Sequence, residues 1–497
     1  MSARTLMIQG TSSSVGKSLI AAGLCRVFND DGYRVAPFKS QNMALNSAVT
    51  PDGYEISRSQ TMQAEAARVT PAVAMNPVLL KPKGDRRAQV ILRGKPFGDF
   101  EARQYREEVT GYALETVREC LAELRRDYQV VVIEGAGSPA EINLRANDIA
   151  NMTIAEMADA PVILVGDIDR GGCLAALVGT MELLAPEERR RVKGIIINKF
   201  RGDLGLLQPG LDFLEERLGL PILGVLPYVR LELPEEDSLG LADGPVRSEV
   251  GIAVGVIRLP RISNFTDFDA LRCEPDVTVR YIERSADLAG VDLIILPGTK
   301  NTTADLAWLR SNGLAERIAA VADHALILGI CGGYQMMGRE IHDPLGLESE
   351  LPQLPGLGLL PIITRFEAGD KTLQQVQATW PDGSGTDHPI LGYEIHQGIS
   401  EISGNANLFR LADGSWEGCQ VNQHLFGTYL HGCLDNDSFR IHLLNIIRRR
   451  KGLSLSAAVR SFREIREESY RQLAAMLRQN LDLRTIYDWL GLEYGTA

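Results

Sequence analysis

The sequence contains few cysteines, and no two of them stand in a CxxC pair. They are odd in number and scattered along the chain, as Cys25, Cys120, Cys173, Cys273, Cys331, Cys419 and Cys433. This pattern argues against a disulfide framework and against a zinc site. The sequence also has no apolar run as long as a membrane span, and its first residues contain no apolar signal core. We therefore expect a protein of a reducing compartment, most simply the cytoplasm, without a membrane partner.

The sequence also contains fewer basic than acidic residues. The formal net charge is −12 and the isoelectric point is near 5.3. An acidic protein of this kind is not expected to bind nucleic acid or anionic membranes in general. It can still contain a local basic pocket for an anionic small molecule. The sequence shows neither internal repeats nor low-complexity tracts, and it leaves the oligomeric state open, a homo-oligomer included.

The chain has 497 residues, too many for one hydrophobic core, so we expect two or three domains. In the first half, short apolar runs alternate with longer amphipathic stretches. This alternation predicts an α/β domain over residues 1–228, with a parallel sheet covered by helices. The predicted strands are 5–9, 34–38, 128–135, 160–167, 192–200 and 220–228, and the clearest helical patterns cover 18–32 and 105–127.

A change of composition separates the two halves. Residues 229–249 are rich in acidic residues, glycine and proline, and we interpret them as a linker. Apolar strand patterns resume after it and predict a second α/β domain over residues 250–447. Residues 448–497 have helical spacing and many charges, which predicts a C-terminal helical segment that packs on the body of the protein.

A phosphate-binding loop follows the first predicted strand. Its sequence, GTSSSVGKS, lies between a strand and a helix, the context that such a loop requires. Backbone N–H groups at a helix N-terminus bind phosphate oxygens, a lysine supplies charge for the β- and γ-phosphates, and a serine hydroxyl suits Mg²⁺. The expected ligands are therefore ATP and Mg²⁺. The predicted binding residues are Gly10, Thr11, Gly16, Lys17 and Ser18.

The loop has one residue more than the common form, since five residues separate Gly10 from Gly16. In this it resembles the dethiobiotin synthetase group of ATPases, which phosphorylate a carboxylate-type group. The resemblance implies that Glu134, at a strand end, ligates Mg²⁺ and that Asn198 binds adenine. The alternatives are a solvated strand-end acid for Glu134 and an ordinary turn residue for Asn198.

Two further basic features suit an anionic substrate. Lys39 ends a predicted strand, on the edge where α/β sheets bind ligands, so its charge suits a transferring phosphoryl group or a carboxylate. A run of basic residues follows later in the same domain, with Asp85 as its single acid. A solvated surface loop is the alternative explanation. The basic residues of this run are Lys81, Lys83, Arg86, Arg87, Arg93 and Lys95.

The second domain contains a candidate nucleophile. The sequence GICGG, centred on Cys331, follows an apolar strand and precedes a helix, which makes a sharp turn similar to a nucleophile elbow. The glycines permit the turn, and the helix N-terminus favours the reactive thiolate. A lone cysteine is more often a small buried apolar residue, but the flanking glycines favour catalysis.

A general base is expected downstream of this turn. His431, in GTYLHG, suits the role, and His396, in GYEIHQ, is its strongest rival. The amides of Gly298 and Gly332 are candidates for an oxyanion hole. The other competing histidines are His324, His342, His388, His424 and His442.

This Cys–His arrangement resembles class I glutamine amidotransferases, which take nitrogen from glutamine with a Cys-His-Glu triad. Here Cys433 stands two residues after His431, where that Glu is expected. The departure fits the cobyrinic and cobyric acid subgroup, whose members lack the Glu. We expect another group, either a backbone carbonyl or an acid distant in sequence, to orient His431.

From end to end the sequence resembles the cobyric acid synthase family. The resemblance implies that four peripheral carboxylates of adenosylcobyrinic acid a,c-diamide are amidated to give adenosylcobyric acid. Each amide would form through an acyl phosphate, with one ATP and with ammonia from one glutamine. The corrinoid substrate rests on the resemblance alone. The motifs that carry it are PFKSQNMALNS (37–47), EGAGSPAEINL (134–144), GDIDRGG (166–172), NKFRGD (198–203), RLPRISNFTDFDAL (258–271), LPGTKNT (296–302), GICGGYQMMG (329–338), GYEIHQG (392–398) and GTYLHG (427–432).

Two other functions stay open. Cobyrinic acid a,c-diamide synthase has a similar architecture but acts on two acetate carboxylates, and PFKSQNMALNS and NKFRGD favour the first interpretation over it. An ATP-driven switch with an inactive glutaminase-like domain belongs to a different class. The combination of Cys331 and His431 argues against that switch, and glutamate release from glutamine would discriminate the two.

Overall fold

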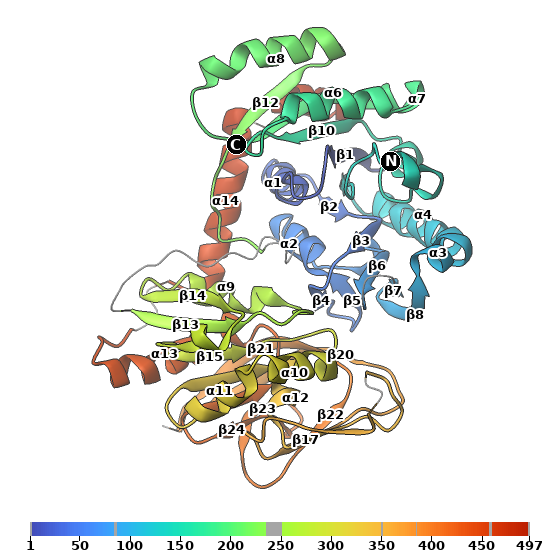
Figure 1. Cartoon of the computed structure of the whole chain (residues 1–497). Helices are drawn as coiled ribbons and strands as arrows, with labels where there is room; N and C mark the ends of the chain where they lie inside the picture. Colours follow the sequence, from blue (N-terminus) through green and yellow to red (C-terminus); the bar gives the residue numbers. More distant parts are fainter. Residues whose placement is uncertain are drawn as a thin grey trace. The chain divides into compact units, whose positions relative to one another are not determined.

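The computed structural model of the protein describes residues 2–83, 87–234, 251–348, 351–383, 385–456 and 460–495. The chain divides into two units, coloured by sequence in Figure 1. Met1–Ala44, Tyr54–Glu236 and Arg466–Ala497 form the first unit. Leu45–Gly53 and Asp237–Ile465 form the second. The first unit has a parallel sheet and the second a mixed sheet with a parallel half, each with helices, so the predicted α/β fold class is confirmed.

The central sheet of the first unit is parallel, with strands in the order β12-β11-β10-β1-β9-β2. Strands β1, β9 and β10 are buried along almost their whole length, as expected for strands with helices on both faces. The strand bounds are β1 Arg4–Gly10, β2 Val35–Phe38, β9 Val130–Glu134, β10 Val162–Asp167, β11 Val192–Phe200 and β12 Ile222–Pro227.

A smaller sheet in the first unit was not predicted. Its strands lie in the order β3-β6-β7-β8, with β3 parallel to β6 and the other pairs antiparallel. Three residues of the basic run found in the sequence lie in its strands, namely Lys81, Arg87 and Lys95. The bounds are β3 Gln41–Met43, β6 Val78–Pro82, β7 Arg87–Leu92 and β8 Lys95–Glu101, and the short strand β5 spans Glu55–Ser57.

The helices of the first unit come from both ends of the chain. Leu477 of α14 and Tyr487 of α15 are fully buried in the same apolar cluster as Leu24 and Phe28 of α1. The predicted C-terminal helices are therefore present and pack on the first unit. The helices are α1 Lys17–Asp30, α2 Arg58–Ala66, α3 Ala102–Gln104, α4 Thr110–Asp127, α5 Met152–Ala158, α6 Cys173–Leu183, α7 Pro186–Arg189, α8 Leu204–Leu218, α14 Phe462–Asn480 and α15 Leu483–Leu490, with 3₁₀ turns at Val73–Met75 and Ile142–Asn147 and a π-helical turn at Tyr105–Val109.

The large sheet of the second unit has the order β14-β13-β15-β16-β25-β24-β23-β20-β21. It is parallel from β14 to β25 and antiparallel from there to β21. The bounds are β13 Ile252–Ile257, β14 Val277–Ile282, β15 Leu293–Leu296, β16 Leu326–Ile330, β20 Thr372–Pro381, β21 Asp387–His396, β23 Asn407–Leu411, β24 Trp416–Val421 and β25 Leu425–Thr428. A second sheet runs β18-β17-β19-β22, with β17 Glu340–His342, β18 Gln353–Pro355, β19 Ile362–Arg365 and β22 Ile399–Ile402.

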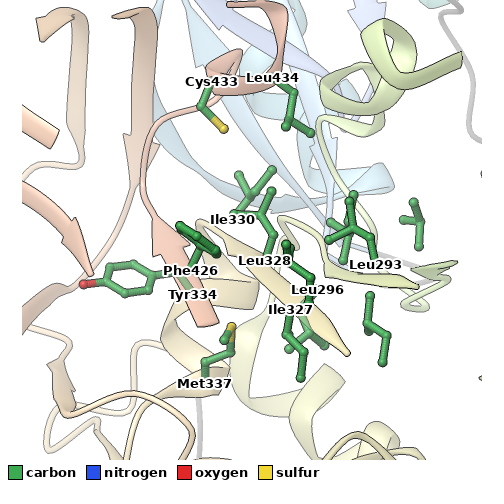
Figure 2. Packing of buried hydrophobic residues seen from close by; sticks show 14 of the residues in the cluster. Leu293, Leu296, Ile327, Leu328, Ile330, Tyr334, Met337, Phe426, Cys433 and Leu434 are labelled. Atoms are coloured by element: carbon green, nitrogen blue, oxygen red, sulfur yellow. The ribbon is translucent and has the colours of Figure 1, made fainter. Parts of the chain in front are cut away.

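Apolar side chains from the strands and helices form one core in the second unit. Figure 2 shows part of it, with Leu296, Ile327 and Leu328 among the labelled core residues together with Cys433 and Leu434. The helices of this unit are α9 Asp269–Arg272, α10 Thr302–Ser311, α11 Leu314–Val321, α12 Gly332–Met337 and α13 Asp437–Lys451, with 3₁₀ turns at Phe265–Phe268, Ser285–Leu288 and Cys433–Asp435.

The units and the predicted domains differ in two segments. Leu45–Gly53, inside the predicted first domain, belongs to the second unit, where strand β4 (Ser47–Val49) contacts β20 and β21. The end of the chain from Arg466 returns to the first unit. Of the predicted linker 229–249, residues 235–249 lie outside the described part of the chain.

Among the helices of the described residues, none combines the length and apolar character needed to cross a bilayer.

Candidate active sites

The phosphate loop joins β1 to α1, as its sequence predicts. Gly10 ends β1 and Lys17 begins α1. Gly16 has φ +102°, in the region that favours glycine, and a Cβ there would lie 2.1 Å from Asn198 Nδ2. The backbone N–H of Thr11 donates to a carbonyl of β10 at 3.0 Å. The loop therefore has the strand–loop–helix geometry that binds phosphate at a helix N-terminus.

The amine of Lys17 lies between two loops. Its Nζ donates to the carbonyl oxygens of Ser12, at 2.9 Å, and Gly137, at 3.0 Å. Gly137 belongs to the loop that follows β9. The two loops therefore meet at the cation that would contact a nucleotide's terminal phosphates.

Glu134 lies at the end of β9 and is only 1% exposed. The alternative of a solvated strand-end acid is therefore wrong. Its Oε1 accepts hydrogen bonds from Ser18 Oγ at 2.8 Å and Lys39 Nζ at 2.9 Å. Its Oε2 accepts one from Gln63 Nε2 at 2.6 Å. A buried carboxylate requires such partners, and the predicted residues Ser18, Lys39 and Glu134 meet here.

The oxygens of Ser18 and Glu134 fit Mg²⁺ in their chemistry. Mg²⁺ prefers hard oxygen ligands, and in phosphoryl-transfer sites it takes one or two from the protein and others from the substrate phosphates and water. The pair matches that donor set. In the ranges that the structure describes, no cluster of three or more His, Cys, Asp or Glu side chains could hold a metal ion.

Asn198 is buried within β11, so it is not an ordinary turn residue. Its Nδ2 donates to Val15 O at 2.7 Å. The next residue, Lys199, donates to Ser14 O at 2.6 Å and to Asp167 Oδ2 at 2.8 Å. These contacts hold the phosphate loop against the sheet. Adenine binding by Asn198 stays a prediction.

The basic run of the sequence is not one basic surface. Lys81 is buried and forms an ion pair with Glu55. Lys83 and Arg93 are paired with acidic side chains of neighbouring elements, and Arg86 lies outside the described residues. Neither a solvated surface loop nor a substrate-binding surface therefore accounts for every basic residue of this run.

Cys331 occupies the turn between β16 and α12 in the second unit. Its φ of 52° and ψ of −111° are rare for a non-glycine residue, and such strain is typical of functional sites. A Cβ at Gly333 would lie 1.9 Å from Leu296 O, so only glycine fits there. This is the sharp turn that the glycine spacing predicts.

His431 is held by an acid that the sequence analysis did not single out. Its Nδ1 is hydrogen-bonded to Asp267 Oδ2 at 2.7 Å, and Asp267 Oδ1 accepts from Gly432 N at 3.0 Å. The side chains of His431 and Asp267 are 1% and 2% exposed. The ring of Tyr393 stacks on the imidazole with centroids 5.3 Å apart. The imidazole is therefore fixed in orientation, with Nδ1 committed to the carboxylate.

The groups around His431 determine its pKa. Burial lowers the pKa of His431, but the charge and hydrogen bond of Asp267 outweigh burial, and a hydrogen bond with Cys331 adds to them. The pKa of His431 is consequently raised to about 10. The structure thus brings Cys331, His431 and Asp267 together.

The predicted oxyanion-hole glycines adjoin this set. A Cβ on Gly298 would lie 3.1 Å from His431 Cε1, and one on Gly332 would lie 2.6 Å from Thr299 Cγ2. Thr299 Oγ1 donates to Asp305 Oδ2 at 2.5 Å, which fixes the loop that contains Gly298. Both glycines therefore lie beside the candidate nucleophile and base.

Two other residues have different contacts: His396, the rival base, and Cys433, which stands where the Glu of the triad is expected. The ring of His396 stacks on Tyr429 at 3.7 Å, and its Nδ1 is 2.8 Å from Gly398 O. Cys433 is fully buried in the apolar core, near Leu434 in Figure 2. Burial raises the pKa of the Cys433 thiol well above its ordinary value. A neutral thiol of this kind packs the core and does not orient an imidazole.

Sequence reasoning left the orienting group open between a carbonyl and a distant acid. Asp267 is that acid, 164 positions before His431. A signal exists in the motif NFTDFD, where Asp267 lies between Phe265 and Phe268, both buried in the core. The same motif also contains Asp269, so the sequence does not choose between the two acids.

Comparisons with known proteins place the chain in a family. A model described as a CobQ/CobB/MinD/ParA nucleotide binding domain matches residues 6–239, and one described as a CobB/CobQ-like glutamine amidotransferase domain matches 253–439. A cobyric acid synthase of Moorella thermoacetica is 50% identical to the chain, and the match covers 99% of this chain and 98% of that protein. The chain belongs to the cobyric acid synthase family.

Two other cobyric acid synthases match along nearly their whole length. That of Sorangium cellulosum is 50% identical, with 99% of this chain and 100% of that protein covered. That of Geobacillus kaustophilus is 48% identical, with 97% and 96% covered. The nucleotide-binding match contains the phosphate loop and Glu134, and the amidotransferase match contains Cys331, Asp267 and His431. This member of the cobyric acid synthase family is therefore an enzyme of the glutamine amidotransferase class that also uses a nucleotide.

Proposed function

We propose that the protein amidates four peripheral carboxylates of adenosylcobyrinic acid a,c-diamide, with ATP, Mg²⁺ and glutamine, to give adenosylcobyric acid. One observation carries the proposal. A phosphate loop with a buried Ser18–Glu134–Lys39 cluster and a Cys331–His431–Asp267 set occur in one chain. That chain is 50% identical over nearly its full length to proteins named cobyric acid synthase.

In the proposed glutaminase reaction, the Cys331 thiolate attacks the carboxamide carbon of glutamine. The backbone amides of Gly298 and Gly332 stabilise the negative oxygen of the tetrahedral intermediate. His431 gives its proton to the leaving nitrogen, so ammonia departs and a thioester forms. His431 then takes a proton from water, which attacks the thioester and releases glutamate. Asp267 keeps the imidazole oriented and compensates its positive charge.

In the proposed synthetase reaction, the chain's residues hold the phosphates and the acceptor. Bound ATP with its Mg²⁺ supplies an electrophilic γ-phosphorus. Backbone amides from Gly10 to Gly16 bind phosphate oxygens, and Lys17 compensates the charge of the transferring group. Ser18 and Glu134 would hold the metal ion, and Lys39 lies beside them for the developing charge.

A substrate carboxylate oxygen then bonds to the γ-phosphorus as ADP leaves, which gives an acyl phosphate. Ammonia attacks its carbonyl carbon, loses a proton, and the amide forms as inorganic phosphate departs. We also propose a reducing, cytoplasmic compartment, because a thiolate nucleophile requires a free cysteine. All seven described cysteines are free of disulfides.

The experiment supplies purified protein with adenosylcobyrinic acid a,c-diamide, ATP, Mg²⁺ and glutamine, and follows the corrinoid by mass spectrometry. Four successive carboxylate-to-amide steps are expected, each with one ADP and one glutamate. Heavy oxygen in the substrate carboxylates should appear in the released inorganic phosphate. Heavy oxygen in AMP would contradict the acyl phosphate. Activity on cobyrinic acid alone would assign the protein to the a,c-diamide reaction.

A further inference from the structure

The first unit contains a cavity of about 500 Å³ whose role is not assigned by the two sites above. Strands β6, β7 and β8 of the small sheet line one part of it, and the loop after β9 lines another. The π-helical turn Tyr105–Val109 also contributes, through Tyr105 and Arg106. Single π-helical turns within helices are frequent at functional sites. The volume of the cavity is in the range of small-molecule sites.

The lining of the cavity combines apolar and cationic groups. Leu80, Val90, Phe100, Ile149 and Met152 supply apolar surface. Three exposed arginines, Arg87, Arg106 and Arg145, also line it. Arg145 forms an ion pair with Glu188, another lining residue.

Within the described ranges, Arg87 and Arg106 form no ion pair, although most other basic residues of this region do. Apolar surface with unpaired guanidinium groups fits a ligand that is apolar in its body and anionic at its edge, because arginine binds carboxylates through paired hydrogen bonds.

The cavity adjoins the phosphate loop. Gly137, a lining residue, accepts a hydrogen bond from Lys17 Nζ at 3.0 Å. Asn151, also in the lining, fixes the same loop by donating to Ala136 O at 2.7 Å. The Oδ1 of Asn151 is buried without a hydrogen-bond partner among the described residues. A ligand in this cavity would thus be next to the lysine that contacts the terminal phosphates.

We propose that this cavity binds the acceptor, a polycarboxylated macrocycle, with one edge of the ring against the apolar lining. Arg87 and Arg106 bind its peripheral carboxylates, and the carboxylate nearest Gly137 is the one phosphorylated. This assignment rests on the proposed function and adds the residues that recognise the acceptor.

Amidation weakens the binding of the macrocycle by these arginines. Each reaction turns an anionic carboxylate into a neutral amide, which accepts weaker hydrogen bonds from arginine than a carboxylate does. The arginines therefore hold the diamide substrate more tightly than the product, which has four fewer carboxylates. Discrimination between substrate and product comes from charge, since the macrocycle is the same in both.

The test compares wild type with Arg87→Gln, Arg106→Gln and the double variant, with cobyrinic acid a,c-diamide as the probe. Loss of a charge-assisted pair should weaken binding by about 10-fold for each arginine. KM for the corrinoid should rise accordingly, while KM for ATP and glutamate release without corrinoid stay unchanged. Arg118→Gln is the matched control, since Arg118 lies on α4 in an exposed ion pair with Glu115 and does not line the cavity.

A second variant tests the cavity independently of charge. Ala88→Trp fills part of the space lined by Ala88, so it should raise KM for the corrinoid about 10-fold or more. ATP binding shows that each variant is folded at the nucleotide site. If wild type neither binds nor amidates the corrinoid, the proposed function fails. If wild type amidates it and both the double variant and Ala88→Trp keep the wild-type KM, the cavity assignment alone is overturned.

Discussion

At the scale of single residues, the hydrogen bond from His431 to Asp267 fixes the imidazole and raises its pKa within the Cys331–His431–Asp267 set. Asp267→Asn keeps the size of the side chain but removes the charge that raises the pKa of His431. We expect glutaminase activity to fall about 10²-fold or more, because the imidazole loses its orientation and its compensating charge. Glutamate release at saturating glutamine measures this loss.

The same variant has a predicted pH signature. In wild type the raised pKa keeps His431 protonated, so it can donate to the leaving ammonia until the pH rises through that pKa. Without the Asp267 charge, burial lowers the pKa, and the proton is lost at lower pH. The alkaline limb of the pH–rate profile should therefore move to lower pH. An unchanged limb in a folded variant would mean that Asp267 does not act on His431.

Replacing Cys433 should affect glutaminase activity much less than replacing His431. Because it packs the apolar core, Cys433→Ala should change glutaminase activity by only a few-fold, whereas His431→Ala should lose about 10²-fold or more. Cys433→Glu should not raise coupled turnover, since the added carboxylate would be buried among apolar groups. Equal damage from Cys433→Ala and His431→Ala would put Cys433 in the catalytic apparatus.

At the scale of elements, the backbone path of the phosphate loop depends on Gly16. Gly16→Ala would add a Cβ 2.1 Å from Asn198 Nδ2 at a φ of +102°, so the loop cannot keep its path. We expect ATP-dependent amidation to be lost with either glutamine or ammonia, while glutamate release persists. Gly111→Ala on α4 is the control, because a Cβ there meets nothing within 4 Å. Normal amidation by Gly16→Ala would remove this loop from the phosphoryl path.

Local patterns predicted some elements and missed others. The parallel strands of the first unit and both glycine turns were predicted, because apolar runs and glycine spacing are properties of short segments. The sheet β3-β6-β7-β8 was missed, since β3 has only three residues and β8 is largely exposed. Asp267 was missed because its partner is 164 residues away. Its loop is held by Asn46 and Ser47, from a segment predicted to belong to the other domain.

At the scale of the whole molecule, the end of the chain stabilises its beginning. Leu477 of α14 is fully buried, and a Cβ on Gly23 of α1 would lie 2.5 Å from its Cδ1, so the two helices pack closely. Leu477→Ala should destabilise the first unit by about 2–5 kcal/mol. Urea unfolding followed at the nucleotide site measures this, with Leu206→Ala, 84% exposed, as control. Equal stability of the two variants would contradict the packing.

We propose that one site of the chain makes ammonia with a thiol and that another site uses this ammonia with ATP. The most direct test is Cys331→Ala with cobyrinic acid a,c-diamide, ATP and Mg²⁺, supplied with either glutamine or ammonium salt. We expect no amidation from glutamine and nearly wild-type amidation from ammonia, because the synthetase site does not use the thiol. Loss of both activities in a folded variant that still binds ATP would contradict it.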